Sequence, residues 1–187
     1  MRYTVVFDAC VLYPAPLRDF LLRLSMTGLF SAKWTDQIHD EWIRNVLKSR
    51  PELQDKLPRT RELMNTAVPD SLVTAYEPLI ESLSLPDADD RHVLAAAIRA
   101  SAQAIITFNL NDFPNEILVQ YGVEAIHPDT FIEHQLDLNQ GIVIAAAKQH
   151  REALKKTPKT ADEYIETLAA QGLAISADRF RDFMELI

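Results

Sequence analysis

The sequence is poor in cysteine and glycine, and this scarcity excludes several kinds of site. Its 187 residues include one cysteine, Cys10, so neither an internal disulfide framework nor a cysteine-based zinc cluster can form. The four glycines form neither GxGxxG nor GxxxxGK, which excludes the usual glycine-rich phosphate loops. The five histidines are scattered without zinc spacing. A lone thiol fits a reducing compartment, and we expect a cytoplasmic protein.

Long apolar runs are also missing. Asp8 interrupts the first run, so we expect no signal peptide, and the run from Ile142 to Ala147 is too short to span a bilayer. We therefore expect no membrane contact. Basic residues are outnumbered, 19 against 27 acids, and the formal charge of −8 argues against a general nucleic-acid-binding protein. A cluster of metal-binding acids would contribute to this excess and be neutralised by its ion.

The order of the apolar segments predicts an α/β fold. The strands expected are residues 2–7, 31–34, 103–108 and 123–126, with a weaker stretch at 72–76. Segments whose apolar residues recur at helical spacing lie between these strands. This alternation predicts a mostly parallel sheet with right-handed crossovers. From about residue 130 the pattern is helical only. We therefore predict an α/β domain over residues 1–130 and a helical C-terminal extension over residues 131–187.

Polar residues predict where the helices of the extension begin. Thr160 and Glu163 form a capping box, while Asp129 and Ser176 are placed to cap the first and the last helix. Three basic residues near the middle of the extension are candidate RNA contacts: Lys148, Arg151 and Lys155. The alternative for these three residues is a solvated surface, which is the more frequent explanation for such runs.

Aspartates lie where predicted strands end and where a helix begins. Asp8 comes directly after the first strand, and Asp112 follows the strand at 103–108. Asp90 opens an alanine-rich helix, and on its own such an acid is explained by helix capping. Ligands of open α/β sheets bind beyond the carboxyl ends of the strands. We therefore expect these three acids to share one edge of the sheet.

A fourth acid, Glu41, lies beside Trp42 on the apolar side of a predicted helix, so its carboxylate can point inward. Arg44 and Lys48 follow on the same side and would hold a phosphate backbone near it. The alternative is a solvated helix face with a surface ion pair between Asp40 and Arg44.

Acids that converge in this way suit a hard divalent cation. Carboxylates about 4–6 Å apart repel one another and raise each other's pKa unless a cation compensates. Mg²⁺ and Mn²⁺ prefer carboxylate and water oxygens. Such an ion lowers the pKa of bound water and stabilises charge on a phosphodiester oxygen. The acids therefore predict a Mg²⁺ or Mn²⁺ site used in phosphoryl chemistry.

Four segments resemble those of the PIN-domain nucleases, most closely the VapC-type ribonuclease toxins of bacterial toxin–antitoxin modules. The segments are VVFDACVL around Asp8, the helix with Glu41, DADDRHVLAAA from Asp87, and TFNLNDFP from Thr107. The resemblance covers about the first 130 residues. The region after Thr130 resembles the helical C-terminal extension of one subgroup of these toxins.

The resemblance implies a sheet in the order 3-2-1-4-5, flanked by helices, with an acidic pocket at its C-terminal edge. Asp8, Glu41 and Asp90 match the three principal acidic positions of the family. The distance from Asp90 to the small-residue face of its helix favours it over Asp87 and Asp89. We expect Asp87 and Asp89 to cap the helix or to support the metal ligands through hydrogen bonds.

The last matching segment departs from the family pattern at Asn109, where the family often has an aspartate. Asn109 can coordinate through its carbonyl oxygen or orient water, and Asp112 would supply the missing charge. Thr107 would orient a metal-bound water or a carboxylate.

The function implied is metal-dependent endonucleolytic cleavage of RNA by a toxin with a cognate antitoxin and, as often in the family, a homodimer. Asp8, Glu41, Asp90 and Asp112 would hold Mg²⁺ or Mn²⁺. One alternative is a catalytically degenerate PIN-like module that binds RNA or protein. Another is a haloacid-dehalogenase-like phosphohydrolase, which requires a second acid where this chain has Cys10.

Overall fold

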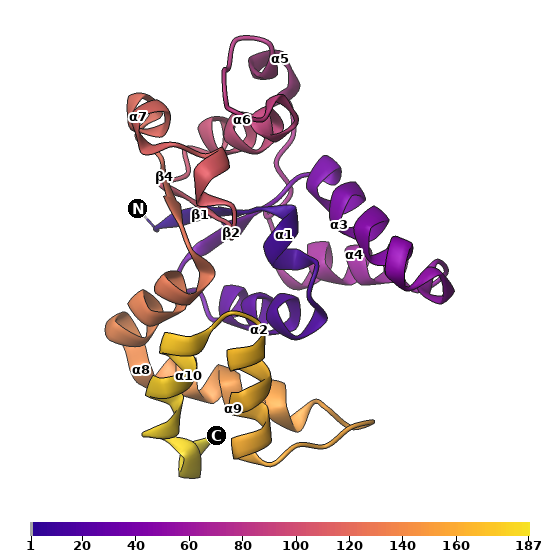
Figure 1. Cartoon of the computed structure of the whole chain (residues 1–187), viewed down its shortest axis with the longest axis vertical. Helices are drawn as coiled ribbons and strands as arrows, with labels where there is room; N and C mark the ends of the chain where they lie inside the picture. The colour runs from indigo at the N-terminus through magenta and orange to yellow at the C-terminus, as the bar shows by residue number, and fades with distance from the viewer. Residues whose placement is uncertain (1) are drawn as a thin grey trace.

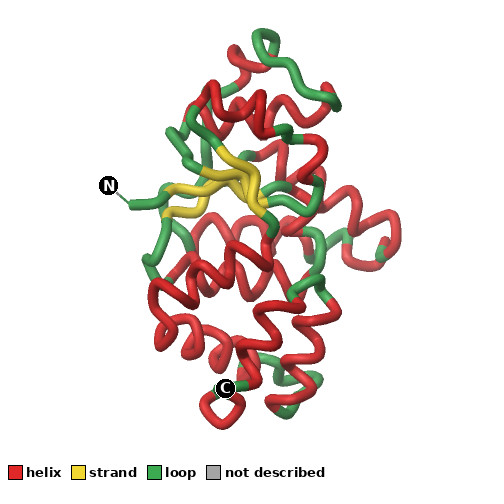
Figure 2. Tube along the Cα trace, turned by 60° about the vertical axis from the view of Figure 1, so that its left-hand side comes forward, coloured by secondary structure: helices red, strands yellow, loops and turns green. Residues whose placement is uncertain are grey.

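A parallel sheet forms the centre of the molecule. The computed structural model describes residues 2–187, and within them the sheet has four strands in the order β2-β1-β3-β4. Its strands are β1 (Thr4–Phe7), β2 (Ser31–Lys33), β3 (Ala104–Ile106) and β4 (Glu124–Ile126). Every pair of neighbouring strands is parallel. Figure 2 shows this sheet between layers of helices, which confirms the predicted α/β fold.

The sheet has one strand fewer than the order 3-2-1-4-5 implies. The four strands keep their places in that order, but the stretch at 72–76 contributes only an isolated parallel bridge between Trp34 and Leu72. The backbone turns into the left-handed region on both sides of this bridge, at Asp70 (φ 63°) and Ala75 (φ 58°). An extended strand cannot continue through either residue, so the expectation of a fifth strand is wrong.

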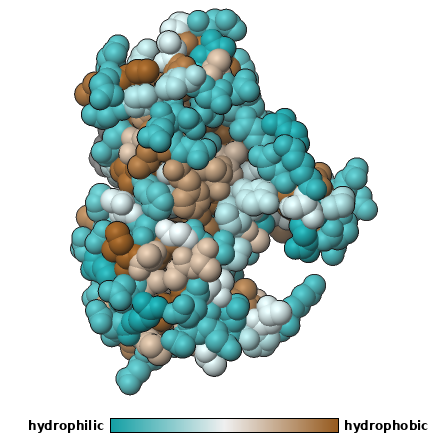
Figure 3. Space-filling view, viewed as in Figure 1, coloured by the Kyte–Doolittle hydropathy of each residue, from teal (hydrophilic) through white to brown (hydrophobic). Residues whose placement is uncertain are grey.

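Helices cover both faces of the sheet. Those of the first part of the chain are α1 (Ala9–Leu12), α2 (Ala15–Met26), α3 (Asp36–Ser49), η1 (Pro51–Leu53), α4 (Leu57–Ala67), α5 (Glu77–Ile80), η2 (Ala88–Asp90), α6 (Arg91–Arg99), η3 (Leu110–Asp112), α7 (Asn115–Leu118) and η4 (Val119–Tyr121). Figure 1 shows α6 and α7 above the sheet, α2 below it, and α3 with α4 as an arm to the right. Much of this arm has a hydrophilic surface in Figure 3.

The central strand β1 is buried on both faces. Val5, Val6 and Phe7 have no exposed surface. The Phe7 ring contacts Trp34 and Phe131, with centroids 6.5 Å and 6.3 Å apart. Because Phe131 belongs to the first C-terminal helix, this part of the chain shares the core of the sheet.

The C-terminal helices are α8 (Pro128–Glu152), α9 (Ala161–Ala170), α10 (Ala174–Arg181) and η5 (Met184–Leu186). Helix α8 bends at Asn139, whose φ of −157° and ψ of 84° are not helical. The predicted capping box of Thr160 and Glu163 opens α9, as expected. Helix α8 begins before the predicted division at residue 130, and the two-domain division stays a prediction. Among residues 2–187, no helix is both long and apolar enough to cross a membrane.

A buried aspartate links the first turn of α8 to the first turn of α10. The Asp129 carboxylate accepts hydrogen bonds from the backbone N–H groups of Ile175 and Ser176, both at 2.8 Å, and from Ser176 Oγ at 2.6 Å. The expected capping roles of Asp129 and Ser176 are therefore wrong. Helix α8 is capped by His127, and α10 begins after Leu173. Both predicted caps bind each other instead, because the fold brings them together.

We expect Asp129→Ala to lower the free energy of unfolding by about 2–4 kcal/mol, because it leaves buried donors without acceptors. Urea unfolding at pH 7.5 measures the change. Asp137→Ala removes an exposed aspartate paired with Arg179 and should cost less than about 1 kcal/mol. Equal losses in the two variants would contradict the role assigned to Asp129.

A buried histidine should make stability depend on pH. His150 is 3% exposed, its Nδ1 lies 2.9 Å from the Tyr164 hydroxyl, and its ring stacks on Phe20. Burial, and then the charge of Arg23, lowers the pKa of His150 from 6.5 to about 4. The unfolded chain therefore takes up this proton at higher pH than the folded chain. The neutral His150 ring therefore contributes fully to the free energy of unfolding above pH 6.5, and this contribution is lost as the pH falls towards 4.

We expect this loss to reach about 2–3 kcal/mol between pH 6.5 and 4. Urea unfolding at several pH values checks it, with His150→Gln as the comparison. Because glutamine does not titrate, the variant should lose stability less steeply over this interval. Parallel profiles for the wild type and the variant would show that His150 is not responsible.

Candidate active site

The site is built around Asp8, at the point where β1 ends. The Asp8 N–H still donates to Ile106 O across the sheet (3.1 Å), and the next residue, Ala9, begins α1. Asp8 caps this helix, because its Oδ1 accepts from the Ala9 N–H at 2.7 Å. The side chain is therefore fixed at the carboxyl edge of the sheet, and the residue is only 4% exposed.

The second Asp8 oxygen is held by side chains that follow the ends of the two central strands, β1 and β3. Thr107 Oγ1 donates to Asp8 Oδ2 at 2.8 Å, and Cys10 Sγ donates at 3.2 Å. Burial raises the pKa of Asp8, and these hydrogen bonds act in the opposite direction. Burial and the charge of Asp8 raise the pKa of the Cys10 thiol to about 12, so Cys10 keeps the proton that it donates. Sequence reasoning did not assign Cys10 to the site.

Asp90 lies at the start of α6 and is half-buried among other acids. Burial, and after it the charges of Asp8, Asp87, Asp112 and Glu41 in that order of effect, raise its pKa from 3.8 to about 7. Each of these carboxylates is therefore near enough for its charge to act on the Asp90 carboxyl. The structure brings the four candidate metal ligands and Asp87 into one acidic neighbourhood.

Glu41 reaches the same neighbourhood from α3. Its Oε1 lies 2.8 Å from Nε2 of His92, whose side chain is 2% exposed, against 22% for Glu41. The alternative pairing of Asp40 with Arg44 is wrong, since Asp40 pairs with Arg61 at 2.7 Å. His92 was part of a matching motif, but its contact with Glu41 was not foreseen.

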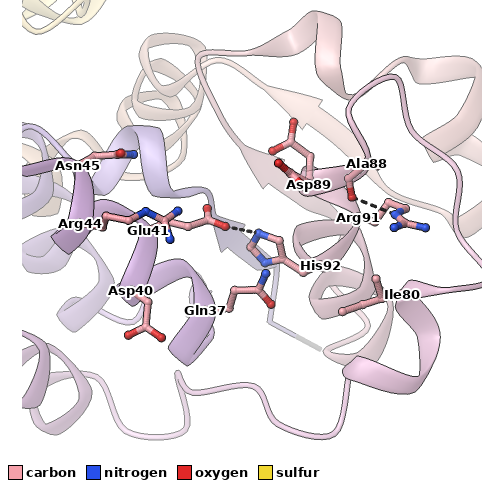
Figure 4. Close-up of a pocket in the computed structure, with 11 residues that line it drawn as sticks. Gln37, Asp40, Glu41, Arg44, Asn45, Ile80, Ala88, Asp89, Arg91 and His92 are labelled. Carbon is pink, nitrogen blue, oxygen red and sulfur yellow. Dashed lines mark hydrogen bonds and ion pairs between the residues drawn. The ribbon is translucent and has the colours of Figure 1, made fainter.

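A cavity of about 600 Å³ lies between α3 and the η2–α6 segment (Figure 4). Glu41 and Asp90 contribute carboxylates to its lining, and Arg44 and Arg91 contribute cations. Figure 4 shows Glu41 and His92 directed towards each other across the space between the two helices. With Asp40 and Asp89 also in the lining, the cavity places two arginines among four carboxylates.

The other residues expected around the ligands differ in their exposure to solvent. Asp87 caps η2 by accepting from the Asp89 N–H at 2.9 Å, and Asp89 lines the cavity. Asn109 is exposed, and its backbone N–H donates to Thr107 Oγ1 at 3.0 Å. Thr107 is fully buried and links this loop to Asp8.

The candidate RNA contacts fall into two separated groups. Arg44 lines the cavity, and Lys48 is exposed on the same helix. Lys148, Arg151 and Lys155 belong to α8 and the loop after it, which Figure 1 shows at the opposite end of the molecule from α6. Arg151 donates to the carbonyl oxygens of Lys159 and Ile187, at 2.9 Å and 3.1 Å, and so holds the end of the chain.

The donor chemistry of the site fits a hard divalent cation. Within residues 2–187, no three His, Cys, Asp or Glu side chains surround one point as metal ligands do. The candidate ligands are nevertheless all carboxylates, and their charges oppose one another at Asp90. A divalent cation relieves this repulsion, and carboxylate oxygens are the ligands that Mg²⁺ and Mn²⁺ prefer.

Two family models match the chain. Residues 4–111 match the model described as PIN domain, and residues 128–182 match the VapC50 C-terminal domain. The chain therefore belongs to the PIN-domain family. The predicted resemblance, a PIN domain followed by a C-terminal extension of the VapC kind, is confirmed.

A curated relative carries the name "Putative ribonuclease VapC50" and comes from Mycobacterium tuberculosis (strain H37Rv). It is 37% identical over 111 residues, which are 57% of this chain and 65% of the relative. The match thus spans less than two thirds of that protein. None of the solved structures matches the chain.

We expect Asp90→Asn to stabilise the metal-free protein at pH 8, because it removes one of several like charges. Solvent screens a half-exposed carboxylate, so the gain should be about 1 kcal/mol. Thermal unfolding in EDTA measures it, and Asp55→Asn, an exposed change on the α3–α4 arm, should leave the melting temperature unchanged. A lower melting temperature for Asp90→Asn would show that Asp90 is held by favourable contacts rather than by repulsion.

Proposed function

We propose that this protein is a metal-dependent endoribonuclease and acts as the toxin of a toxin–antitoxin pair. The observation that supports the proposal is that the charges of Asp8, Glu41 and Asp112 all act on Asp90, beside the carboxyl edge of a PIN-domain sheet. The name of the mycobacterial relative supports RNA as the substrate. Membership of the PIN-domain family removes the haloacid-dehalogenase-like alternative.

Each acid would have a distinct part in holding the cofactor. Asp8 is immobilised by Ala9, Thr107 and Cys10, so it would present its remaining lone pairs in a fixed direction. Asp90 and Asp112 would complete the ligand set with Glu41. When bound, Mg²⁺ or Mn²⁺ supplies an activated water and stabilises charge on the phosphodiester.

The reaction would be an in-line displacement at phosphorus. Glu41 would accept a proton from the attacking water, whose oxygen bonds to phosphorus as the bond from phosphorus to O3′ breaks and O3′ takes up a proton from solvent. The products would carry a 5′-phosphate and a 3′-hydroxyl. Thr107 would keep Asp8 oriented throughout, and the exposed Asn109 would orient water through its amide.

The RNA would approach through the cavity beside α3. Arg44 and Arg91 line it, and Lys48 lies exposed on α3, so phosphates near the cut would meet cations. Lys148, Arg151 and Lys155 would extend this binding only for an RNA long enough to reach the extension. We further propose a cytoplasmic protein with a cognate antitoxin and a homodimeric state.

Purified protein with Mg²⁺ or Mn²⁺ should cut RNA, and Asp8→Asn or Asp90→Asn should lower the rate by at least about 10²-fold at unchanged fold. Gel assays of labelled RNA measure the rate, and mapping of the product ends tests for 5′-phosphates. Asp137→Asn, far from the site, is the matched control. Cleavage that survives EDTA, or wild-type rates in the Asp8 and Asp90 variants, would overturn metal-dependent catalysis at this site. No cleavage by the wild-type protein would favour the catalytically degenerate binding module.

A further inference from the structure

We propose that His92 is a positioning residue that holds the Glu41 carboxylate against helix α6. This inference rests on the proposed function, because it assigns Glu41 its place in the ligand set. The contact itself is a distance of 2.8 Å between His92 Nε2 and Glu41 Oε1. His92 is the second residue of α6, and Glu41 lies in the middle of α3.

The surroundings of His92 leave this carboxylate as its natural partner. His92 is 2% exposed, and within residues 2–187 neither ring nitrogen has an aligned hydrogen-bond partner. Buried polar atoms in folded proteins nearly always have partners, so an imidazole with none invites a functional explanation. The charged group next to Nε2 is the Glu41 carboxylate, at 2.8 Å.

Another buried histidine shows what a purely structural role looks like in this protein. His39 is fully buried, and both of its ring nitrogens are used inside the core. Its Nδ1 accepts from Trp42 Nε1 at 3.0 Å, and its Nε2 lies 3.0 Å from Asn65 Oδ1. His92 lacks such partners and instead points towards the cavity that contains Glu41 (Figure 4).

The contact connects the two helices that carry candidate ligands. Asp90 and His92 are two residues apart at the start of α6, while Glu41 comes from α3. A link from His92 to Glu41 therefore limits how far the Glu41 carboxylate can move from Asp90. A ligand ordered before the cation arrives loses less conformational freedom on binding, which is how outer contacts of this kind strengthen metal sites.

Helix α3 does not need this link in order to stay in place. Trp42 is fully buried, and the Arg18 guanidinium lies 4.5 Å from the centroid of its ring. Thr35 caps the helix by accepting from the Ile38 N–H at 3.0 Å. Loss of the His92 contact should therefore free the Glu41 side chain and leave the helix where it is.

The test compares His92→Phe, which keeps a ring and removes the donor, with His92→Gln, whose amide nitrogen can still donate. In the full-length protein, His92→Phe should weaken Mn²⁺ binding about 10–100-fold. It should lower kcat for RNA cleavage and leave KM within about twofold, because Glu41 acts on the reacting centre rather than on substrate affinity. His92→Gln should recover most of both losses. Calorimetry measures the binding, and circular dichroism checks the fold.

A double-mutant cycle separates positioning from general disturbance. Once Glu41→Gln has removed the carboxylate, a second change at His92 should weaken Mn²⁺ binding no further. Additive losses would overturn the inference, as would wild-type binding by His92→Phe or equal losses in the Phe and Gln variants. If the Phe variant does not fold, His92→Ala, which also removes the donor, replaces it in the same cycle: coupling to Glu41 supports the link, and additivity overturns it.

The Asp8→Asn variant distinguishes a failure of this inference from a failure of the proposed function. If Asp8→Asn abolishes Mn²⁺ binding and the His92 variants have no effect, only the positioning role is overturned. If Mn²⁺ binding does not depend on Asp8 or Asp90 at all, the proposed metal site is overturned with it.

Discussion

The site depends on the burial of one carboxylate at the seam between the two central strands. An acid as buried as Asp8 is costly unless its oxygens are hydrogen-bonded. Its partners come from both sides of the seam, Ala9 and Cys10 from the β1 side and Thr107 from the end of β3. The parallel pairing of Phe7 with Ile106 places these ends level with each other. The register of two strands thus determines where the first ligand stands.

Around this fixed point the other acids arrive on helices, and the arrangement opposes stability. Glu41 comes from α3 and Asp90 from the start of α6, and both add negative charge beside Asp8. The core offsets this repulsion, because Val5, Val6 and Phe7 of β1 are fully buried and the buried Trp42 anchors α3. Such a distribution is expected where a protein assembles like charges for a cation to neutralise.

The sequence was informative where a role is visible in local pattern. Asp8 follows a strongly apolar strand, so its place at the edge of the sheet could be predicted. His92 could not be separated from a core residue, because its distinguishing feature is the lack of partners other than Glu41. Asp129 has the local pattern of a helix cap, yet its partners Ile175 and Ser176 are more than forty residues away in the chain. The fifth strand is missing because Asp70 and Ala75 have positive φ angles. Neither residue is a glycine, so the composition of this stretch does not reveal the turn.

The C-terminal helices contribute to the site through the loop that follows β3. Gly172, between α9 and α10, has a φ of +84°, and a Cβ atom there would lie 3.2 Å from Phe108 Cε1. The backbone N–H of Phe108 donates to Cys10 Sγ at 3.3 Å. Phe108 is thus packed by the extension on one side and tied to the Asp8 cluster on the other. Because the same loop carries Thr107, the extension helps to fix the hydroxyl that orients Asp8, and a change at this turn would be transmitted to the first ligand.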